Sequence, residues 1–499
     1  MNISPFVTNM DRPVFALRGL PEEVVAVLFA YYSRSTGSLR QNLERLLADG
    51  DVAIGAAPAE SEDALSDAME KARKFHEKWV VGYGHSSVAE HAVVHLALED
   101  VSILASKVIE DARLASYTEK STRYVVFNED RYYTPSSLAE GPSAAIYREA
   151  CRHLLGAYAR LMPEAVEKVK ARRPRGPKQT ERGWETACKA AACDILRYLL
   201  PASTRTNIGL TVNARALEYL LTKMMSNPLE ECRDLGVSMK AEAQRVAPTL
   251  IKYAEPNPYM VETRAALQAF TPWKAAHEAP LENAVRLVKA PQDPEADLAA
   301  ALLYEYSDES WETLRCNCAN WPSERREEVI RAALLAEENG GRRRRFDQPP
   351  RALEHLYYTF EITLDFGAFR DIQRHRMATQ SRQRLTTAWG YATPPEIAEF
   401  GWLDIYEECM ARAAEAYAAI AREQPEEAQY VVPLAYRMRV LFTWNLREIH
   451  HFVSLRSGKQ GHAAYRKIAQ DVWTELHRLH PLMAEYVRVD MNHYGLARE

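Results

Sequence analysis

The sequence predicts an α+β fold that occurs twice, as two tandem copies of one domain packed as a pseudo-dimer. Two observations predict it. Segments of the first half recur in the second half in the same order, and 499 residues exceed what one hydrophobic core usually supports. We place the boundary near residue 275, which gives a first domain of residues 1–275 and a second of residues 276–499.

The first repeated element is a short strand, an acidic turn and a helix that ends in Tyr and Ser. In the first copy it reads FALRGLPEEVVAVLFAYYSRS, from Phe15 to Ser35. In the second copy it reads VRLVKAPQDPEADLAAALLYEYS, from Val285 to Ser307. We therefore expect a strand and a helix in both places.

The second repeated element begins with a Glu-His pair. SVAEHAVVHLALEDVSILASKVIEDARLAS starts at Ser87, and RALEHLYYTFEITLDFGAFRDIQRHRMAT starts at Arg351. Glu90 and Glu354 are 264 positions apart (354 − 90). An alternating apolar run follows each pair, which predicts a strand, and a helix then leads to a charged motif. His91 and His355, at the start of these strands, are interpreted as structural.

The third repeated element is a strand that leads through Asn-x-Arg into a helix. Asn213 and Asn445 mark it in the two copies and are 232 positions apart (445 − 213). The smaller offset places roughly 30 extra residues in the first copy, among them the basic stretch Lys170 to Trp184. We interpret that stretch as an exposed loop and the Arg342–Arg345 run as a solvated charged segment.

Composition excludes several classes of protein. The chain is 47% hydrophobic and 26% charged, as soluble globular proteins are. No apolar run reaches the roughly 20 residues that span a bilayer, and MNISPFVTNMDRPVF does not resemble a signal peptide, so we expect a cytoplasmic protein without a membrane partner. A net charge of −5 argues against nucleic-acid binding.

The cysteines predict neither a disulfide framework nor a metal site. The chain has 7 of them, scattered and without a CxxC motif. Cys316 and Cys318 form the closest pair, which we interpret as ordinary packing.

The motif Arg374-His375-Arg376 gathers positive charge at the predicted end of a helix. A guanidinium matches a phosphate in geometry and keeps its charge, so the motif suits a pyrophosphate or two adjacent phosphates. Cations also favour a helix C-terminus through the macrodipole. Spacing alone leaves both interpretations open.

The last repeated helix of the second copy adds further polar groups. At 100° per residue, Asn445 and Arg456 lie about 20° apart around the axis. Arg447 and His451 are neighbours by their i, i+4 spacing. Such a face needs a polar partner, which a bound anion or solvent would supply.

Together these residues resemble the flavin-dependent thymidylate synthase family. That family carries Arg-His-Arg, followed seven residues later by Ser-Gly-Arg. It also has His-x-Ser-x-x-Glu-His upstream, and an Asn-x-Arg helix with a later arginine downstream. The resemblance covers most of the chain, and it implies that each copy has an antiparallel or mixed sheet with helices.

The first copy holds one part of the pattern. Its matches to the family are His85, Ser87, Glu90, His91, Glu119, Ser121, Thr122 (in place of Gly), Arg123 and Arg197. Asp111 and Ala112 stand where the first Arg and the His belong, and Met224 replaces the final arginine. Ser121 suits either a ligand or a turn.

The second copy holds the complementary part. Its matches are Arg374, His375, Arg376, Asn445, Arg447, His451 and Arg456. Pro349 and Arg351 replace the upstream His and Ser, Arg384-Leu385-Thr386 replaces Ser-Gly-Arg, and Gln429 stands at the position of Arg197. Asp371 replaces a family Gln, and a carboxylate there would repel a phosphate unless an arginine pairs with it.

The resemblance implies reductive methylation of dUMP to dTMP. Methylenetetrahydrofolate supplies the carbon, FAD carries the hydride and NADPH reduces the flavin. In the family each site lies between two subunits, one giving Arg-His-Arg and the late helix, the other Glu-x-Ser-Gly-Arg. Because the two copies lack complementary pieces, we expect one hybrid site per chain and an inactive mirror site.

By this resemblance, FAD would be bound by Ser87, Arg374, His375, Arg376, Asn445, Arg447 and His451. dUMP would be bound by Glu119, Ser121, Thr122, Arg123, Arg197, Arg374 and Arg456. Two residues are assigned to catalysis: Arg456 would stabilise negative charge on the uracil ring, and His85 would act as a positioning or folate-side residue. No cysteine nucleophile is required.

Two alternatives remain, motivated by Thr122 and Asp371. The chain could be a non-catalytic relative that binds a flavin or nucleotide, or an enzyme that acts on another pyrimidine nucleotide. By analogy with the family, we expect a homodimer that mimics a four-domain assembly.

Overall fold

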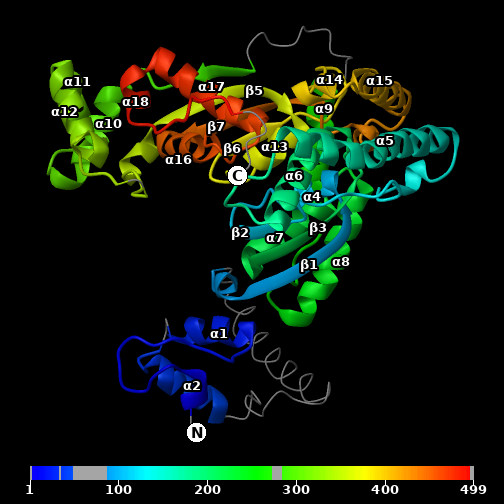
Figure 1. The fold of residues 1–499 in the computed structure, drawn as a ribbon. Helices are drawn as coiled ribbons and strands as arrows, with labels where there is room; N and C mark the ends of the chain where they lie inside the picture. The colour runs from blue at the N-terminus through cyan, green and yellow to red at the C-terminus, as the bar shows by residue number, and fades with distance from the viewer. Residues whose placement is uncertain (1–2, 33–34, 49–86, 272–283, 345, 495–499) are drawn as a thin grey trace. The chain divides into compact units, whose positions relative to one another are not determined.

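The computed structural model describes residues 3–32, 35–48, 87–271, 284–344 and 346–494. The chain forms two compact units (Figure 1). Unit 1 comprises Met1–Val101, Ala105–Lys120 and Thr206–Trp273, and unit 2 comprises Ser102–Leu104, Ser121–Arg205 and Lys274–Glu499. Residues 121–205 of the first copy thus pack with the second copy. The repeat boundary near residue 275 lies outside the described residues and stays a prediction.

Unit 1 contains a sheet with the strand order β1-β3-β2. Its strands are β1 (Val93–Ser102), β2 (Ala115–Glu119) and β3 (Arg205–Asn213), and β2 is antiparallel to β3. The helices are α1 (Glu22–Tyr32), α2 (Leu39–Ala48), α4 (Ile103–Ile109), α7 (Ala214–Met225), α8 (Glu230–Val246) and α9 (Pro258–Phe270), with 3-10 turns at Ser4–Phe6 and Val88–His91. β1 and α7 confirm the strand after the first Glu-His pair and the helix after Asn213.

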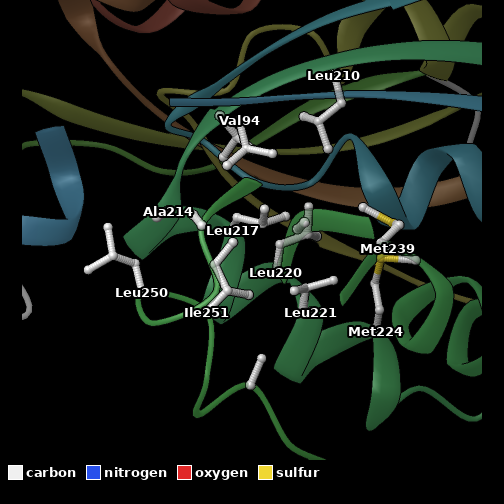
Figure 2. Packing of buried hydrophobic residues seen from close by; sticks show 14 of the residues in the cluster. Val94, Leu210, Ala214, Leu217, Leu220, Leu221, Met224, Met239, Leu250 and Ile251 are labelled. Atoms are coloured by element: carbon white, nitrogen blue, oxygen red, sulfur yellow. The ribbon is translucent and has the colours of Figure 1, made fainter. Parts of the chain in front are cut away.

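The core of unit 1 forms between its sheet, α7 and α8 (Figure 2). α7 places Leu217, Leu220, Leu221 and Met224 on one buried face, at the spacing of an amphipathic helix. Met224 is fully buried, and it occupies the position that Arg456 holds in the second copy. The first copy therefore uses this helix face for packing.

The strand expected from Phe15 is not formed. Val7 and Leu17 make an isolated antiparallel bridge instead. Gly19 follows with a φ of 65°, which turns the chain into the left-handed region just before α1 and ends any extended run.

Unit 2 is built on an antiparallel sheet with the order β4-β5-β7-β6. The strands are β4 (Val285–Lys289), β5 (Tyr357–Asp365), β6 (Thr379–Arg382) and β7 (Arg437–Asn445). β4 and β5 confirm the strands expected at Val285 and after the second Glu-His pair. The α+β class is thus as predicted, and the order of strand and helix recurs in both copies for the second and third repeated elements.

Helices complete unit 2 (Figure 1). They are α5 (Pro142–Arg172), α6 (Glu181–Leu196), α10 (Pro294–Leu303), α11 (Trp311–Ala319), α12 (Ser323–Leu334), α13 (Phe366–Ile372), α14 (Pro395–Glu399), α15 (Leu403–Ile420), α16 (Leu446–Arg456), α17 (Ala463–Leu479) and α18 (Pro481–Glu485). Short 3-10 turns lie at Ser136–Leu138, Arg197–Leu199, Tyr304–Tyr306, Glu337–Asn339, Arg351–His355 and Glu427–Val431.

Alternation along β7 builds the core of unit 2. Met438, Val440, Phe442 and Trp444 are buried on one face of the strand. Trp444 stacks on Phe442 and on Phe452 of α16, each with a centroid distance of 4.8 Å. These contacts fix α16 against the sheet, and α16 carries the polar residues of the candidate site.

The two copies meet inside unit 2 through a reciprocal contact. Pro201 and Pro433, which are 232 positions apart, form an antiparallel bridge. Backbone hydrogen bonds flank it in matched pairs: Ala202 N to Val432 O with Leu434 N to Leu200 O (both 2.9 Å), and Ser203 N to Tyr430 O (2.9 Å) with Ala435 N to Tyr198 O (3.2 Å). Exchange of equivalent partners is how two-fold-related surfaces pair.

The start of the helix after each Glu-His strand is also held alike in both copies. The matched backbone bonds are Ile103 N to Thr204 O and Leu104 N to Ala202 O in the first copy, and Phe366 N to Tyr436 O and Gly367 N to Leu434 O in the second. These donors are 263 positions apart, one fewer than the Glu-His pairs. β1 is one residue longer than β5 and contains Asp100 with a φ of 57°, where an extra residue is accommodated.

Two charged segments differ from expectation. The stretch Lys170–Trp184 is only partly a loop, because α5 continues to Arg172 and α6 begins at Glu181. Arg343, in the run interpreted as solvated, is buried and donates to the carbonyl of Tyr486 (2.8 Å). A run of like charges in a sequence does not reveal which member finds a carbonyl in the fold.

Two features are absent from the described part of the chain. There, no helix is long and apolar enough to cross a bilayer. Nor do three or more His, Cys, Asp or Glu side chains group so that they could hold a metal ion. Cys318 is buried in α11 and Cys316 is exposed.

The buried position of Met224 predicts the effect of restoring the residue found in the other copy. Met224→Arg should lower the free energy of unfolding of unit 1 by on the order of 3–5 kcal/mol, because it buries an unpaired charge. Met224→Leu, which keeps the volume, should cost less than about 1.5 kcal/mol. The free energy of unfolding of both variants is measured by urea denaturation of the full chain, followed through hydrogen exchange of the α7 amides. Equal stability of the two variants would show that Met224 is not a core residue.

Candidate functional site: an arginine cluster around Asp371

The candidate site in unit 2 forms around a carboxylate on α13. The Asp365 side chain caps this helix, its Oδ1 accepting a hydrogen bond from the amide of Ala368 (2.7 Å). Every residue of α13 is buried, which is how the helix carries Asp371 into the interior. The motif Arg374-His375-Arg376 follows directly, where the helix ends.

Asp371 is the point on which arginines from both copies converge. It is 8% exposed, and a carboxylate oxygen lies 3.6 Å from Nη1 of Arg197. Burial alone would raise its pKa, but in the described structure Arg197, Arg374, Arg123 and Arg456 lower it to about 2. Asp371 is therefore ionised and acts as an internal counter-ion. A carboxylate at this position was expected to need an arginine partner, and Arg197 provides it.

Arg197 is the most deeply buried of these arginines. It lies where α6 ends, is 1% exposed and is bordered by Asp371 and Asp365. Among the described residues, neither its Nε nor its Nη2 has a hydrogen-bond partner. Buried donors of this kind are rare in folded proteins, and a bound anion would satisfy them.

Arg123 is held in a fixed orientation from α6. Its Nε and Nη2 donate to the two carboxylate oxygens of Asp194 (2.7 and 3.0 Å), and its Nη1 donates to the hydroxyl of Tyr465 (3.0 Å). Burial would raise the pKa of Asp194, but its hydrogen bonds with Arg123 lower it. The same pairing raises the pKa of Arg123 despite its burial.

Arg456, at the end of α16, faces the same tyrosine. Its guanidinium lies 5.3 Å from the ring centroid of Tyr465, so Tyr465 contacts one arginine of each copy. Nε of Arg456 donates to Nε2 of His375 (2.9 Å). Burial lowers the pKa of Arg456, although Asp371 opposes this.

His462 closes the cluster beside Arg197. Its Nδ1 accepts a hydrogen bond from the amide of Ala464 (3.2 Å) and so caps α17. Burial, together with the charges of Arg197 and Arg123, lowers its pKa to about 3. The ring is therefore neutral and adds no further charge to the arginines.

Thr122, which stands in place of a family glycine, is accommodated by an arginine. It is buried, and its hydroxyl accepts a hydrogen bond from Nη1 of Arg370 (3.1 Å). Ser121 Oγ accepts a hydrogen bond from the backbone amide of Arg123 (3.2 Å). This contact agrees with the interpretation of Ser121 as a turn residue.

Residues expected at the flavin lie along α16 and the motif, and several already have protein partners. Asn445 caps α16 through a hydrogen bond from Glu448 N (2.8 Å), and Arg447 binds Glu354 and the carbonyl of Pro349 (both 2.9 Å). Asn445 is thus the residue that caps α16 and lies just before the helix. The more accessible residues are Arg374, Arg376 and His451.

A cavity of about 660 Å³ borders α16 near the motif. His451 lines it, and the His451 ring lies 5.5 Å from that of His375. Lys459 and Arg488 add positive charge to the same cavity, which the carboxylate of Asp490 also lines. Its size is in the range of cofactor pockets, and these cations suit a phosphate-bearing ligand.

The remaining expected residues belong to unit 1 or are not described. His85 lies outside the described residues. Ser87 is exposed before the Val88–His91 turn. The carboxylate of Glu119 is buried and accepts hydrogen bonds from Lys107 (3.1 Å) and Ser106 (2.9 Å).

Sequence reasoning missed four residues of the cluster. Asp194 could have been found, because it precedes Arg197 by three residues as Glu426 precedes Gln429 in the other copy. Glu448 directly follows the Asn-x-Arg motif, but it corresponds to no residue of the family pattern. His462 and Tyr465 carry no local signal, since their roles depend on how α17 packs.

Comparison with known proteins identifies the family. The model for "thymidylate synthase complementing protein" matches residues 39–249 and 286–482, once in each copy. A UPF0159 protein of Chlamydia muridarum is 36% identical over 512 aligned residues, covering 99% of this chain and 96% of that protein.

Two flavin-dependent enzymes match a smaller share. A flavin-dependent thymidylate synthase of Clostridium tetani is 29% identical over 204 residues, 40% of this chain and 78% of that enzyme. The crystal structure of the synthase ThyX from Helicobacter pylori, complexed with FAD and dUMP, aligns with 42% of this chain and 100% of its own, at 19% identity and a TM-score of 0.31. With the family model matched twice along the sequence, the chain belongs to the thymidylate synthase complementing protein family, as a tandem duplication.

Proposed function

We propose that the chain is a flavin-dependent thymidylate synthase with one active site, assembled in unit 2 from both copies. It would methylate dUMP to dTMP, with methylenetetrahydrofolate and NADPH as co-substrates. Membership of the family supports this activity. The convergence of Arg123 and Arg197 with Arg374 and Arg456 on Asp371 is the observation that carries it.

The residues present fit the two anionic ligands. The buried donors of Arg197 and the excess of guanidinium groups over carboxylates suit a nucleotide phosphate. The cationic cavity beside His451 suits the diphosphate of FAD. Bound FAD would supply the hydride that the chemistry requires.

The side chains would act by binding, orienting and stabilising charge. Arg123, fixed by Asp194, and Arg197 would bind the nucleotide. Arg374 and Arg376 would bind flavin phosphates. Arg456 would stabilise negative charge on the uracil, a role in which a preorganised guanidinium is most effective in a water-poor site.

One observation favours a second candidate, an enzyme for another pyrimidine nucleotide. Asp371 stands where a family Gln is expected, and its charge offsets part of the arginine cluster. A ligand with a different charge or hydrogen-bonding edge could match this site. Comparison of dUMP with other pyrimidine nucleotides as substrates separates the two candidates.

The activity test uses the full-length chain with FAD, NADPH, methylenetetrahydrofolate and dUMP, and measures dTMP by chromatography. Rescue of a thymidine-requiring bacterial strain checks the result in cells. dTMP formation in vitro and rescue are expected. A chain that takes up no FAD and forms no dTMP would contradict the proposal.

The hybrid site makes a prediction for individual arginines. Arg123→Ala and Arg456→Ala should each lower kcat/KM for dUMP by at least about 100-fold, because each removes a preorganised charge. Arg384→Ala is the matched control. Arg384 is the second-copy counterpart of Ser121 and pairs with Glu426 (3.0 Å). The proposed site does not use Arg384. Equal losses in all three variants, with intact folding by circular dichroism, would refute the single-site assignment.

Asp371 predicts a coupling between stability and ligand binding. Asp371→Asn should lower the melting temperature by on the order of 5–10 °C, because Arg197 loses its buried partner. dUMP or sulfate should raise the melting temperature of this variant more than that of the wild type, since the added anion replaces the missing charge.

Asp471→Asn, which removes the partner of the exposed Lys467 on α17, is the control and should change neither value appreciably. A ligand-induced shift in Asp371→Asn no larger than in the wild type would contradict the role of Asp371 as a counter-ion.

A further inference from the structure

Glu448 is a partly buried acid on α16 without a role in the proposed function. It lies in the first turn of the helix, where its backbone amide is capped by Asn445. A glutamate at this position often returns to the capping residue. Here its carboxylate lies 3.2 Å from Nδ1 of His375. The side chain is thus directed toward the Arg-His-Arg motif.

Hydrogen-bond chemistry fixes the protonation of His375. A guanidinium can only donate, so Nε2 of His375, 2.9 Å from Nε of Arg456, must present its lone pair. The ring is then neutral, with its proton on Nδ1, and that N–H donates to Glu448. Glu448, His375 and Arg456 form one directed chain of hydrogen bonds.

The surroundings hold this chain in place. His375 is 5% exposed, and its ring meets Phe452 edge to face at 5.0 Å. Burial lowers the pKa of His375, in agreement with a neutral ring. The ring has no nitrogen left to offer a ligand, since both are engaged within the protein.

The first copy supplies an independent comparison. At the positions of Glu448, His375 and Arg456 it has Ala216, Ala112 and Met224. All three members are absent together, and Asn213 still caps α7 through the amide of Ala216 (2.8 Å). The helix start therefore forms without the acid, so the acid is not needed for the cap.

We propose that Glu448 is a positioning residue, which sets the tautomer of His375 and thereby directs the guanidinium of Arg456 into the candidate site. The inference rests on the proposed function in so far as Arg456 acts on the nucleotide. It reassigns His375 from a cofactor ligand to the link between Glu448 and Arg456. An unpositioned Arg456 would lose orientation toward the reacting ring.

The direct test is the tautomer of His375, read by nitrogen NMR of the full-length chain with labelled histidine. His375→Gln assigns the signal. The wild type should show the proton on Nδ1. Glu448→Ala should shift the population toward the tautomer protonated on Nε2, whereas Glu448→Gln, whose side-chain oxygen can still accept, should keep the wild-type form.

Kinetics provide the second readout. Glu448→Ala should lower kcat by about 10–100-fold, the range for loss of an orienting partner, with KM for dUMP changed less than about threefold. Glu448→Gln should stay within about threefold of the wild type. Glu327→Ala, which removes an exposed partner of Arg331 on α12, is the matched control and should change neither constant.

Several outcomes would overturn the inference. A wild-type His375 protonated on Nε2 would do so whether or not any variant folds. So would a tautomer unchanged in Glu448→Ala, or a Glu448→Gln enzyme as slow as Glu448→Ala. If the wild type formed no dTMP, the proposed function would fail, while the tautomer measurement would still decide the arrangement of Glu448 and His375.

Discussion

The arrangement of the candidate site in unit 2 depends on one ionic cluster, the buried carboxylate of Asp371 among guanidinium groups. Transfer of these charges from water is costly, and removal of a single partner leaves the others uncompensated. Arg123 and Arg197 come from the first copy, and Arg374 and Arg456 from the second. Neither copy alone could satisfy this cluster. Residues 121–205 belong to one compact unit with the second copy, and this segment carries the two first-copy arginines of the cluster.

The duplication preserved matching backbone contacts in the two copies. The bridge between Pro201 and Pro433 and its reciprocal hydrogen bonds follow the two-fold pattern of an identical pair. Side chains at matching positions have diverged, however. Arg456 is half-buried among polar groups, whereas Met224 lies in an apolar core. The helix keeps its place through packing in both copies, while the residue at its end is apolar in one copy and charged in the other.

Local patterns predicted most of the repeated elements, the strand expected from Phe15 being the exception. Alternation after the Glu-His pairs gave β1 and β5, and the spacing of apolar residues gave α7 and α16, because burial of one face imposes the period. Clustered cations indicated where an anion could bind. Tyr465 and Glu448 could not be anticipated, because their roles arise from contacts between elements distant in the sequence. For the same reason, the run of arginines at Arg342–Arg345 did not predict that Arg343 is buried. Tertiary contacts decide which charged side chains are desolvated.

The central claim is that each chain contains a single site built from both copies. Calorimetric titration of the full-length, FAD-loaded chain with dUMP tests it most directly, since it counts the sites without requiring turnover. The account predicts one nucleotide bound per chain. Two nucleotides per chain would mean that each copy has a site of its own, and no binding would mean that the arginine cluster is solely structural; either result would contradict the account.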